Sequence, residues 1–127
     1  MRRGIIPVLI LAVLMVTPLL AMGCGSASDA AGETSGKPMV IDFWRPGCQP
    51  CEEMEPVLEQ LEKEYGDQVD FIAYNTMEER GKSEQYAIEF VPTFIFLNAE
   101  GEIVDRMVGL VDINTMRDSI KRILPDT

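Results

Sequence analysis

The sequence predicts one small α/β domain, in which four strands form a mixed sheet and three helices cover its faces. The chain has 127 residues, which is room for a single domain of this kind. Short apolar runs alternate with stretches of helical periodicity, and a strand-helix-strand order implies parallel pairing with a right-handed crossover. Two later apolar runs around a turn predict a hairpin, which adds an antiparallel pair. The expected order of elements is β-α-β-α-β-β-α.

The first strand and the first helix have the clearest signals. Residues 39–44 are an apolar run with one charged member, Asp42, which indicates a buried strand. The helix predicted over residues 50–65 follows, and its apolar residues recur at helical spacing: Met54, Val57, Leu58 and Leu61. Pro50 suits the first turn of this helix, whereas Pro56 falls inside it and predicts a kink.

The later elements follow from turn signals and periodicity. We expect a strand over residues 69–75, a helix over 79–90, a hairpin of strands 94–97 and 102–108, and a last helix that begins after Asp112. Asp112 is a favourable N-cap, because its carboxylate can accept hydrogen bonds from the free amides of the first turn. The apolar face of that helix consists of Ile113, Met116, Ile120 and Leu124. The domain is therefore expected to span residues 38–127.

Residues 1–23 are predicted to be an export signal rather than part of the domain. Arg2 and Arg3 precede an uncharged apolar run, Ile5–Met22, which small residues follow. The same run is about long enough to span a bilayer, so an uncleaved transmembrane helix is the alternative. In both cases the positive-inside rule places the domain on the extracytoplasmic side of the membrane.

Cys24 indicates a lipid anchor. The segment from Leu20 to Cys24 resembles the lipobox of bacterial lipoproteins, although Ala21 stands where that motif usually has leucine. The resemblance implies that Cys24 is lipidated and becomes the mature N-terminus. Residues 24–37 would then form a flexible tether, because they consist mainly of Gly, Ser, Ala, Thr and acidic residues without apolar periodicity.

The charge of the chain argues against nucleic acid as a partner. The sequence has 21 acidic and 11 basic residues, and removal of Arg2 and Arg3 with the signal would leave a formal charge of −12. Such a surface repels both a phosphate backbone and anionic lipid headgroups. Contact with the membrane is therefore expected through the lipid anchor alone.

Cys48 and Cys51 are the candidate catalytic residues. They form a C-x-x-C pair between a buried strand and a helix, which is the context of redox-active pairs. The positive end of the helix favours the thiolate of Cys48, the expected nucleophile, whereas Cys51 is expected to be less exposed and to resolve the mixed disulfide. The alternatives are an inert structural disulfide and half of an intermolecular metal site. We expect no metal site within the chain, because the sequence has no histidine and the domain no further cysteine.

Four further features resemble the thioredoxin family. Residues 40–44 resemble the strand that leads into that family's active site, with Asp42 six residues before the first cysteine. Pro56 matches the family's helix proline, Phe90-Val91-Pro92-Thr93 resembles its cis-proline loop, and Gly109 matches the glycine that ends its last strand. The resemblance implies a minimal thioredoxin fold with a four-stranded mixed sheet, without the family's first strand and helix.

The resemblance also implies roles for individual residues. Pro92 would be cis and would leave the backbone of Val91 free to pair with an extended substrate strand. Asp42 would lie buried behind Cys51 with a raised pKa and accept its proton, unless its side chain turns toward solvent. Trp44 would form a wall of the substrate site, with ordinary core packing as the alternative.

Several positions depart from the family pattern. Gly47 stands where thioredoxins usually have a second tryptophan, which leaves that side of the site more open. Glu52 and Glu53 replace a lysine that is common after the second cysteine, and their negative charge opposes a thiolate at Cys48. Pro50 is retained and favours a reducing pair.

We therefore expect a membrane-tethered, extracytoplasmic protein disulfide reductase. It would take electrons from a membrane thiol donor and pass them to disulfides of exported proteins, as a monomer and without a cofactor. A thiol oxidant is the alternative within the same chemistry. A non-catalytic binding or chaperone module is the alternative outside it.

Overall fold

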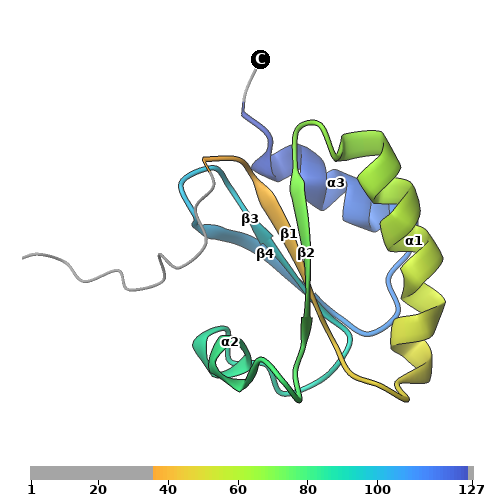
Figure 1. Ribbon diagram of the computed structural model, residues 1–127. Coiled ribbons are helices and arrows are strands. Elements are labelled where there is room, and N and C mark those ends of the chain that lie inside the picture. Colours follow the sequence, from red (N-terminus) through yellow and green to blue (C-terminus); the bar gives the residue numbers. More distant parts are fainter. Residues whose placement is uncertain (1–35, 126–127) are drawn as a thin grey trace, which may run out of the picture.

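The computed structural model describes residues 36–125, which form a four-stranded mixed sheet with helices on both faces (Figure 1). The elements are β1 (Met39–Trp44), α1 (Gln49–Tyr65), β2 (Asp70–Asn75), α2 (Arg80–Gln85), β3 (Thr93–Leu97), β4 (Ile103–Val108) and α3 (Ile113–Ile123). The strands lie in the order β2-β1-β3-β4, with β1 and β2 parallel and the other two pairs antiparallel. The predicted α/β class and the predicted element order are confirmed.

The central strands β1 and β3 are the most deeply buried elements. All of β3 is buried, and in β1 only Asp42 and Trp44 retain partial exposure. Successive side chains of a strand point to opposite faces, so Val40 and Asp42 share one face of the sheet and Ile41 and Phe43 the other. Val40 packs with residues of α1 and α3, so Asp42 also points toward this side of the sheet.

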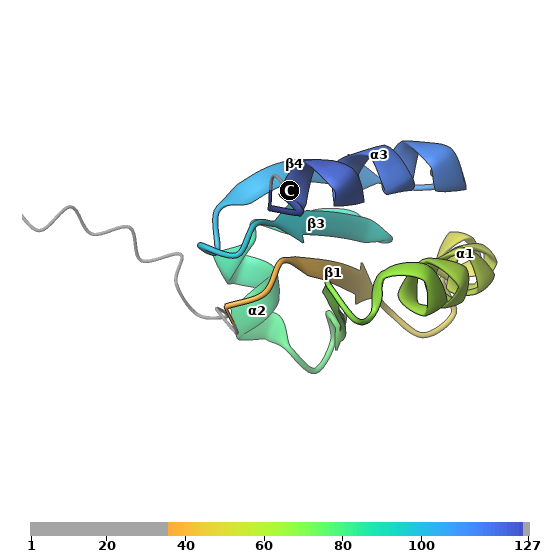
Figure 2. The same cartoon turned by 90° about the horizontal axis from the view of Figure 1, so that it is seen from above.

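Helices α1 and α3 cover one face of the sheet and α2 the other (Figures 1 and 2). Two apolar clusters lie between the sheet and these helices. The larger cluster lies under α1 and α3 and contains Val40, Met54, Leu61, Val69, Phe94, Phe96, Met116, Ile120 and Ile123. The second cluster lies on the opposite face and contains Met39, Ile41, Phe43, Tyr86, Ile95 and Leu97. Burial of one large apolar side chain contributes about 1.5–3 kcal/mol, so these clusters are the main stabilising feature of the fold.

Helix α3 begins where the sequence predicts. The carboxylate of Asp112 accepts hydrogen bonds from the backbone amides of Asn114 and Thr115 at 3.0 and 3.1 Å. Further along, the guanidinium of Arg117 donates two hydrogen bonds to the carboxylate of Glu64 on α1, at 2.6 and 2.8 Å. These hydrogen bonds lower the pKa of Glu64 to about 2. The ion pair therefore joins the two helices that cover the same face of the sheet.

Helix α2 is shorter than the helix predicted over residues 79–90, and the second half of that prediction was wrong. The helix ends at Gln85, and Ala87 has a φ of +48°, in the left-handed region. The guanidinium of Arg106 on β4 donates a hydrogen bond to the carbonyl oxygen of Tyr86 at 2.6 Å. A long-range contact thus satisfies a carbonyl at the helix end, and the chain continues as a loop into β3.

The predicted signal, residues 1–23, lies outside the described residues. So does the predicted tether over residues 24–37, except for its last two positions. The lipidation of Cys24 therefore stays a prediction. Between residues 36 and 125, no helix has both the length and the apolar composition needed to cross a membrane.

Candidate active site

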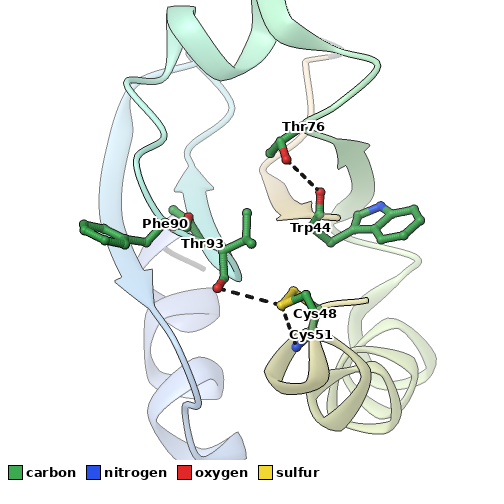
Figure 3. The surroundings of a disulfide bond; sticks show 7 residues. Trp44, Cys48, Cys51, Thr76, Phe90 and Thr93 are labelled. Carbon is green, nitrogen blue, oxygen red and sulfur yellow. Dashed lines mark hydrogen bonds between the residues drawn. A yellow bond between two sulfur atoms is a disulfide. The ribbon is translucent and has the colours of Figure 1, made fainter. Parts of the chain in front are cut away.

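Cys48 and Cys51 form a disulfide at the N-terminus of α1, with 5.3 Å between their Cα atoms (Figure 3). Cys48 is the N-cap of the helix, and its sulfur accepts a hydrogen bond from the backbone amide of Cys51 at 3.3 Å. Gly47, the residue before it, has a φ of +73°, which favours glycine because a Cβ is strained there. The chain thus turns sharply out of β1 and places the Cys48 sulfur against the free amides of the first helical turn.

The surroundings of the two cysteines differ, although their exposure does not. Cys48 is 7% and Cys51 8% exposed, so the expectation that Cys51 is the less exposed residue was wrong. The sulfur of Cys48 lies 3.9 Å from the carbonyl oxygen of Val91, on the loop before β3, which covers it from one side. Cys51 lines a cavity on the α1 side of the sheet together with Asp42.

The loop before β3 holds its backbone close to Cys48. The peptide bond between Val91 and Pro92 is cis, as the resemblance implies. The hydroxyl of Thr93 donates a hydrogen bond to the carbonyl oxygen of Phe90 at 2.7 Å, and the amide of Gly109 donates one to the carbonyl oxygen of Pro92 at 2.8 Å. The last strand and the start of β3 therefore both fix this loop.

Trp44, the last residue of β1, lies on the other side of the disulfide from Phe90 (Figure 3). Its carbonyl oxygen accepts two hydrogen bonds from Thr76, from the amide at 2.9 Å and from the hydroxyl at 3.2 Å. Its side chain is partly exposed and lines the same cavity as Cys51. The structure therefore places Trp44 in the wall of the site and not in the closed core.

Asp42 lies in that cavity, behind Cys51. Burial, and secondly the negative charge of Glu55, raise the pKa of Asp42 to about 6. Its Oδ1 atom is buried and accepts no hydrogen bond from residues 36–125. A carboxyl with this pKa is mostly ionised at pH 7 and can accept a proton from a neighbouring thiol.

Comparison with known proteins decides the family. The family model described as Thioredoxin matches residues 28–122, which is most of the chain.

The chain belongs to the thioredoxin family.

The relatives are thioredoxins of plants, bacteria and animals. An M-type chloroplast thioredoxin of Spinacia oleracea is 38% identical over 87 residues, which are 68% of this chain and 48% of the spinach protein. Thioredoxin 1 of Synechococcus elongatus is 34% identical, over 69% of this chain and 81% of its own length. The X-ray structure of Fasciola hepatica thioredoxin superimposes with a TM-score of 0.62 at 31% identity, over 69% of this chain and 82% of that one. The chain spans about half the length of the spinach protein. The thioredoxin fold is confirmed, and the family supports thiol-disulfide exchange by Cys48 and Cys51.

The sequence alone did not identify three exposed apolar residues near the thioredoxin-type disulfide. Phe90, Met77 and Leu110 are 67%, 63% and 59% exposed. Each lies in a loop at the end of the sheet where β1 leads into Cys48: Phe90 before β3, Met77 after β2 and Leu110 after β4. Phe90 belongs to the segment that resembles the cis-proline loop, but nothing in the sequence indicates that its side chain is exposed. Large apolar residues are normally assigned to the core, so Met77 and Leu110 have no signal that singles them out.

Glu55 is the other residue that the sequence does not identify. It is one of several glutamates on α1, and only the folded structure shows that it lines the cavity of Asp42 and Cys51. No group of three or more potential metal ligands occurs within the described part of the chain.

Proposed function

We propose that this protein is a thiol-disulfide oxidoreductase that reduces disulfides of other proteins through Cys48 and Cys51. The observation that carries the proposal is the position of Cys48 as the N-cap of α1, with the amide of Cys51 3.3 Å from its sulfur. Helix amides and the positive end of the helix dipole stabilise a thiolate, which is the nucleophile of disulfide exchange. Membership of the thioredoxin family supports the same activity.

The reaction has two steps. The Cys48 thiolate first attacks one sulfur of the partner's disulfide, so that a Cys48–partner bond forms and the partner's own S–S bond breaks. The released partner thiolate takes a proton from solvent. Cys51 then gives its thiol proton to the Asp42 carboxylate and attacks the sulfur of Cys48, which releases the second partner thiolate. Two electrons pass to the partner, and the pair ends as the disulfide that the structure contains.

The loop before β3 is the proposed docking site for the partner chain. The carbonyl oxygen of Val91 lies 3.9 Å from the Cys48 sulfur, so an extended segment that pairs with this backbone places its own disulfide next to Cys48. Trp44 and the exposed side chain of Phe90 lie on opposite sides of the disulfide (Figure 3). Met77, in the loop after β2, adds exposed apolar surface at the same end of the sheet. Pro92 supports the loop from the buried side.

We propose that electrons flow from this protein to its partners. Glu52 and Glu53, next to Cys51, destabilise the thiolate of the reduced form, and the dipeptide between the cysteines has no histidine to stabilise it. Both effects place the reduction potential at or below roughly −250 mV, near the −270 mV of thioredoxin. Equilibration of the full chain with dithiothreitol or glutathione buffers measures it. A potential near −120 mV, that of a strong oxidant, would mean that electrons flow from the partners to this protein.

We further propose that lipidated Cys24 anchors the protein on the extracytoplasmic face of a membrane, where it reduces exported proteins and is itself reduced by a membrane thiol donor. The support is the basic start with Arg2, the apolar run Ile5–Met22 and the lipobox-like segment before Cys24. Mass spectrometry of the protein from its native membrane tests the anchor. A mature chain with no mass beyond the polypeptide, or an intact Met1 terminus, contradicts it.

A binding or chaperone module is a second candidate, which the exposed side chains of Phe90, Met77 and Leu110 favour. The Cys48→Ser variant separates the two functions. If the protein is a reductase, the variant loses reduction of insulin disulfides while the wild-type chain has this activity. If the wild-type chain has no such activity and both proteins suppress the aggregation of an unfolded protein equally, the protein is a binding module.

A further inference from the structure

A cavity of about 390 Å³ lies behind the disulfide, between β1, β2 and α1. Asp42 lines it from β1, Ala73 from β2 and Cys51 from α1. Its charged lining residues are Arg45, in the loop after β1, and four residues of α1: Glu52, Glu55, Glu59 and Glu62. The charge around this cavity is therefore predominantly negative, and its acidic residues other than Asp42 all belong to α1.

Asp42 has no cationic partner on the neighbouring strands. Its register partners are Ala73 on β2 and Phe94 on β3, and neither side chain is polar. Its buried Oδ1 accepts no hydrogen bond from the described residues. A carboxylate with a buried oxygen that accepts no hydrogen bond is poorly stabilised, so the protonation of Asp42 responds to a negative charge close to it.

Glu55 is placed to exert that control. It follows Cys51 by four positions on α1, so the two side chains lie on the same face of the helix. Within residues 36–125 it forms no ion pair, whereas Glu64 on the same helix is paired with Arg117. The charge of Glu55 is therefore not neutralised by a contact partner and acts on Asp42. Burial and this charge together raise the pKa of Asp42 to about 6.

We propose that Glu55 is a positioning residue of the redox reaction, whose carboxylate, in the cavity that it shares with Asp42, governs proton transfer from Cys51 to Asp42. This inference rests on the proposed function. In the second step of the reaction Asp42 must be ionised to accept the Cys51 proton. Glu55 favours the protonated form of Asp42, so the step fails at a higher pH than it would without this glutamate. The reductase is thus made sensitive to acidification near pH 6.

The matched variants for the test are Glu55→Gln and Glu59→Gln in the full chain. Both residues are exposed, lie on α1 and line the cavity, so each variant removes one negative charge from the same helix. Carbon-13 NMR follows the Asp42 carboxyl in the oxidised protein, in which Cys48 and Cys51 form the disulfide and do not titrate. Asp42→Asn identifies the signal. We expect Glu55→Gln to lower the titration midpoint of Asp42 from about 6 and Glu59→Gln to leave it unchanged.

The expected change in the ionisation of Asp42 is large enough to alter the reaction rate measurably. A midpoint that falls by about half a pH unit raises the ionised fraction of Asp42 at pH 5 roughly two- to threefold. The reduced chain is mixed with excess insulin in a single turnover, with the fluorescence of Trp44, the sole tryptophan of the sequence, as the readout. We expect the fall of this single-turnover rate at acidic pH, the acid limb of the pH profile, to shift to lower pH in Glu55→Gln alone. The rate of this variant at pH 8 should equal that of wild type.

Three outcomes would overturn the proposal. Equal NMR midpoints in the wild-type chain and Glu55→Gln would show that Glu55 does not act on Asp42. Equal shifts in both glutamine variants would show a general effect of net charge. A shifted midpoint with an unshifted acid limb would show that Glu55 does not govern the reaction. A wild-type chain without reductase activity would instead refute the proposed function, and the NMR midpoints would still decide whether Glu55 controls Asp42.

Discussion

Replacement of Asp42 with asparagine is expected to make the oxidised protein more stable than wild type at pH 8 and less dependent on pH. Asp42 sits on a central strand, and one oxygen of its carboxyl, Oδ1, is buried without accepting a hydrogen bond from the described residues. The folded protein therefore holds the protonated form more tightly than the unfolded chain does. Asparagine has nearly the same shape but no charge, so it removes the ionisation and keeps the packing.

The magnitude follows from the two pKa values. The pKa of Asp42 is raised from 3.8 to about 6 in the folded protein. Below pH 3.8 the group is protonated in both states and has no effect on stability. Between the two values only the unfolded state ionises, so the free energy of unfolding falls as the pH rises, and above pH 6 the loss is complete. The shift corresponds to about 2 to 3 kcal/mol.

Urea denaturation of wild type and Asp42→Asn from pH 4 to pH 8 measures this contribution to the free energy of unfolding. The difference between their free energies of unfolding should grow by about 2 to 3 kcal/mol in favour of Asp42→Asn over that range, mostly below pH 6. Asp67→Asn is the control, because Asp67 is exposed in the turn after α1 and should leave the pH dependence unchanged. Parallel curves for wild type and Asp42→Asn would refute the reasoning that folding raises the pKa of the Asp42 carboxyl by removing part of its solvation.

Three further predictions concern the reaction, the docking surface and the fold. Cys51→Ser should accumulate a mixed disulfide with protein substrates and Cys48→Ser should not; the reverse result in non-reducing gels would exchange nucleophile and resolver. Phe90→Ala should raise the KM for a protein disulfide and leave the rate with a small disulfide unchanged. The control Ile103→Ala should change neither, because Ile103 is an exposed apolar residue at the start of β4, away from the disulfide. Arg117→Ala should lower the urea midpoint at pH 7, because it removes the ion pair with Glu64. The difference from wild type should shrink below pH 4.5 and vanish near pH 2, because the pKa of Glu64 is lowered to about 2 and its carboxylate loses its charge there. A difference that persists at pH 2 would contradict the ion pair as its cause.

Local signals were sufficient to predict most of the fold. The apolar run of β1 and the cap at Asp112 are short-range features, and the structure confirms both at the expected residues. The prediction failed after Gln85, where the sequence has no proline or glycine to end the helix. At this point Arg106, on a distant strand, donates a hydrogen bond to the carbonyl oxygen of Tyr86, which satisfies a carbonyl that the helix leaves free. Such a contact depends on the tertiary arrangement and has no trace in the local sequence.

The site shows the same division between local and long-range causes. The spacing of Cys48 and Cys51 and the position before α1 predict a disulfide at a helix N-terminus, and the structure contains it. Their equal burial could not be predicted, because it arises when the loop with Val91 folds over Cys48. The control of Asp42 by Glu55 was equally inaccessible, since the sequence does not distinguish Glu55 from the other glutamates of α1 before the cavity is formed.

Equal burial of the two cysteines leaves the electrostatic field as the feature that makes them chemically different. The sulfur of Cys48 faces the amide of Cys51 at the positive end of α1, which stabilises a negative charge on that sulfur. Cys51 instead faces a cavity with Asp42 and Glu55, where negative charge is disfavoured and a proton acceptor is at hand. A thiolate at rest therefore belongs on Cys48, and Cys51 ionises only as its proton moves to Asp42. The same helix thus favours the thiolate at Cys48 and the protonated thiol at Cys51, so Cys48 attacks first and Cys51 second.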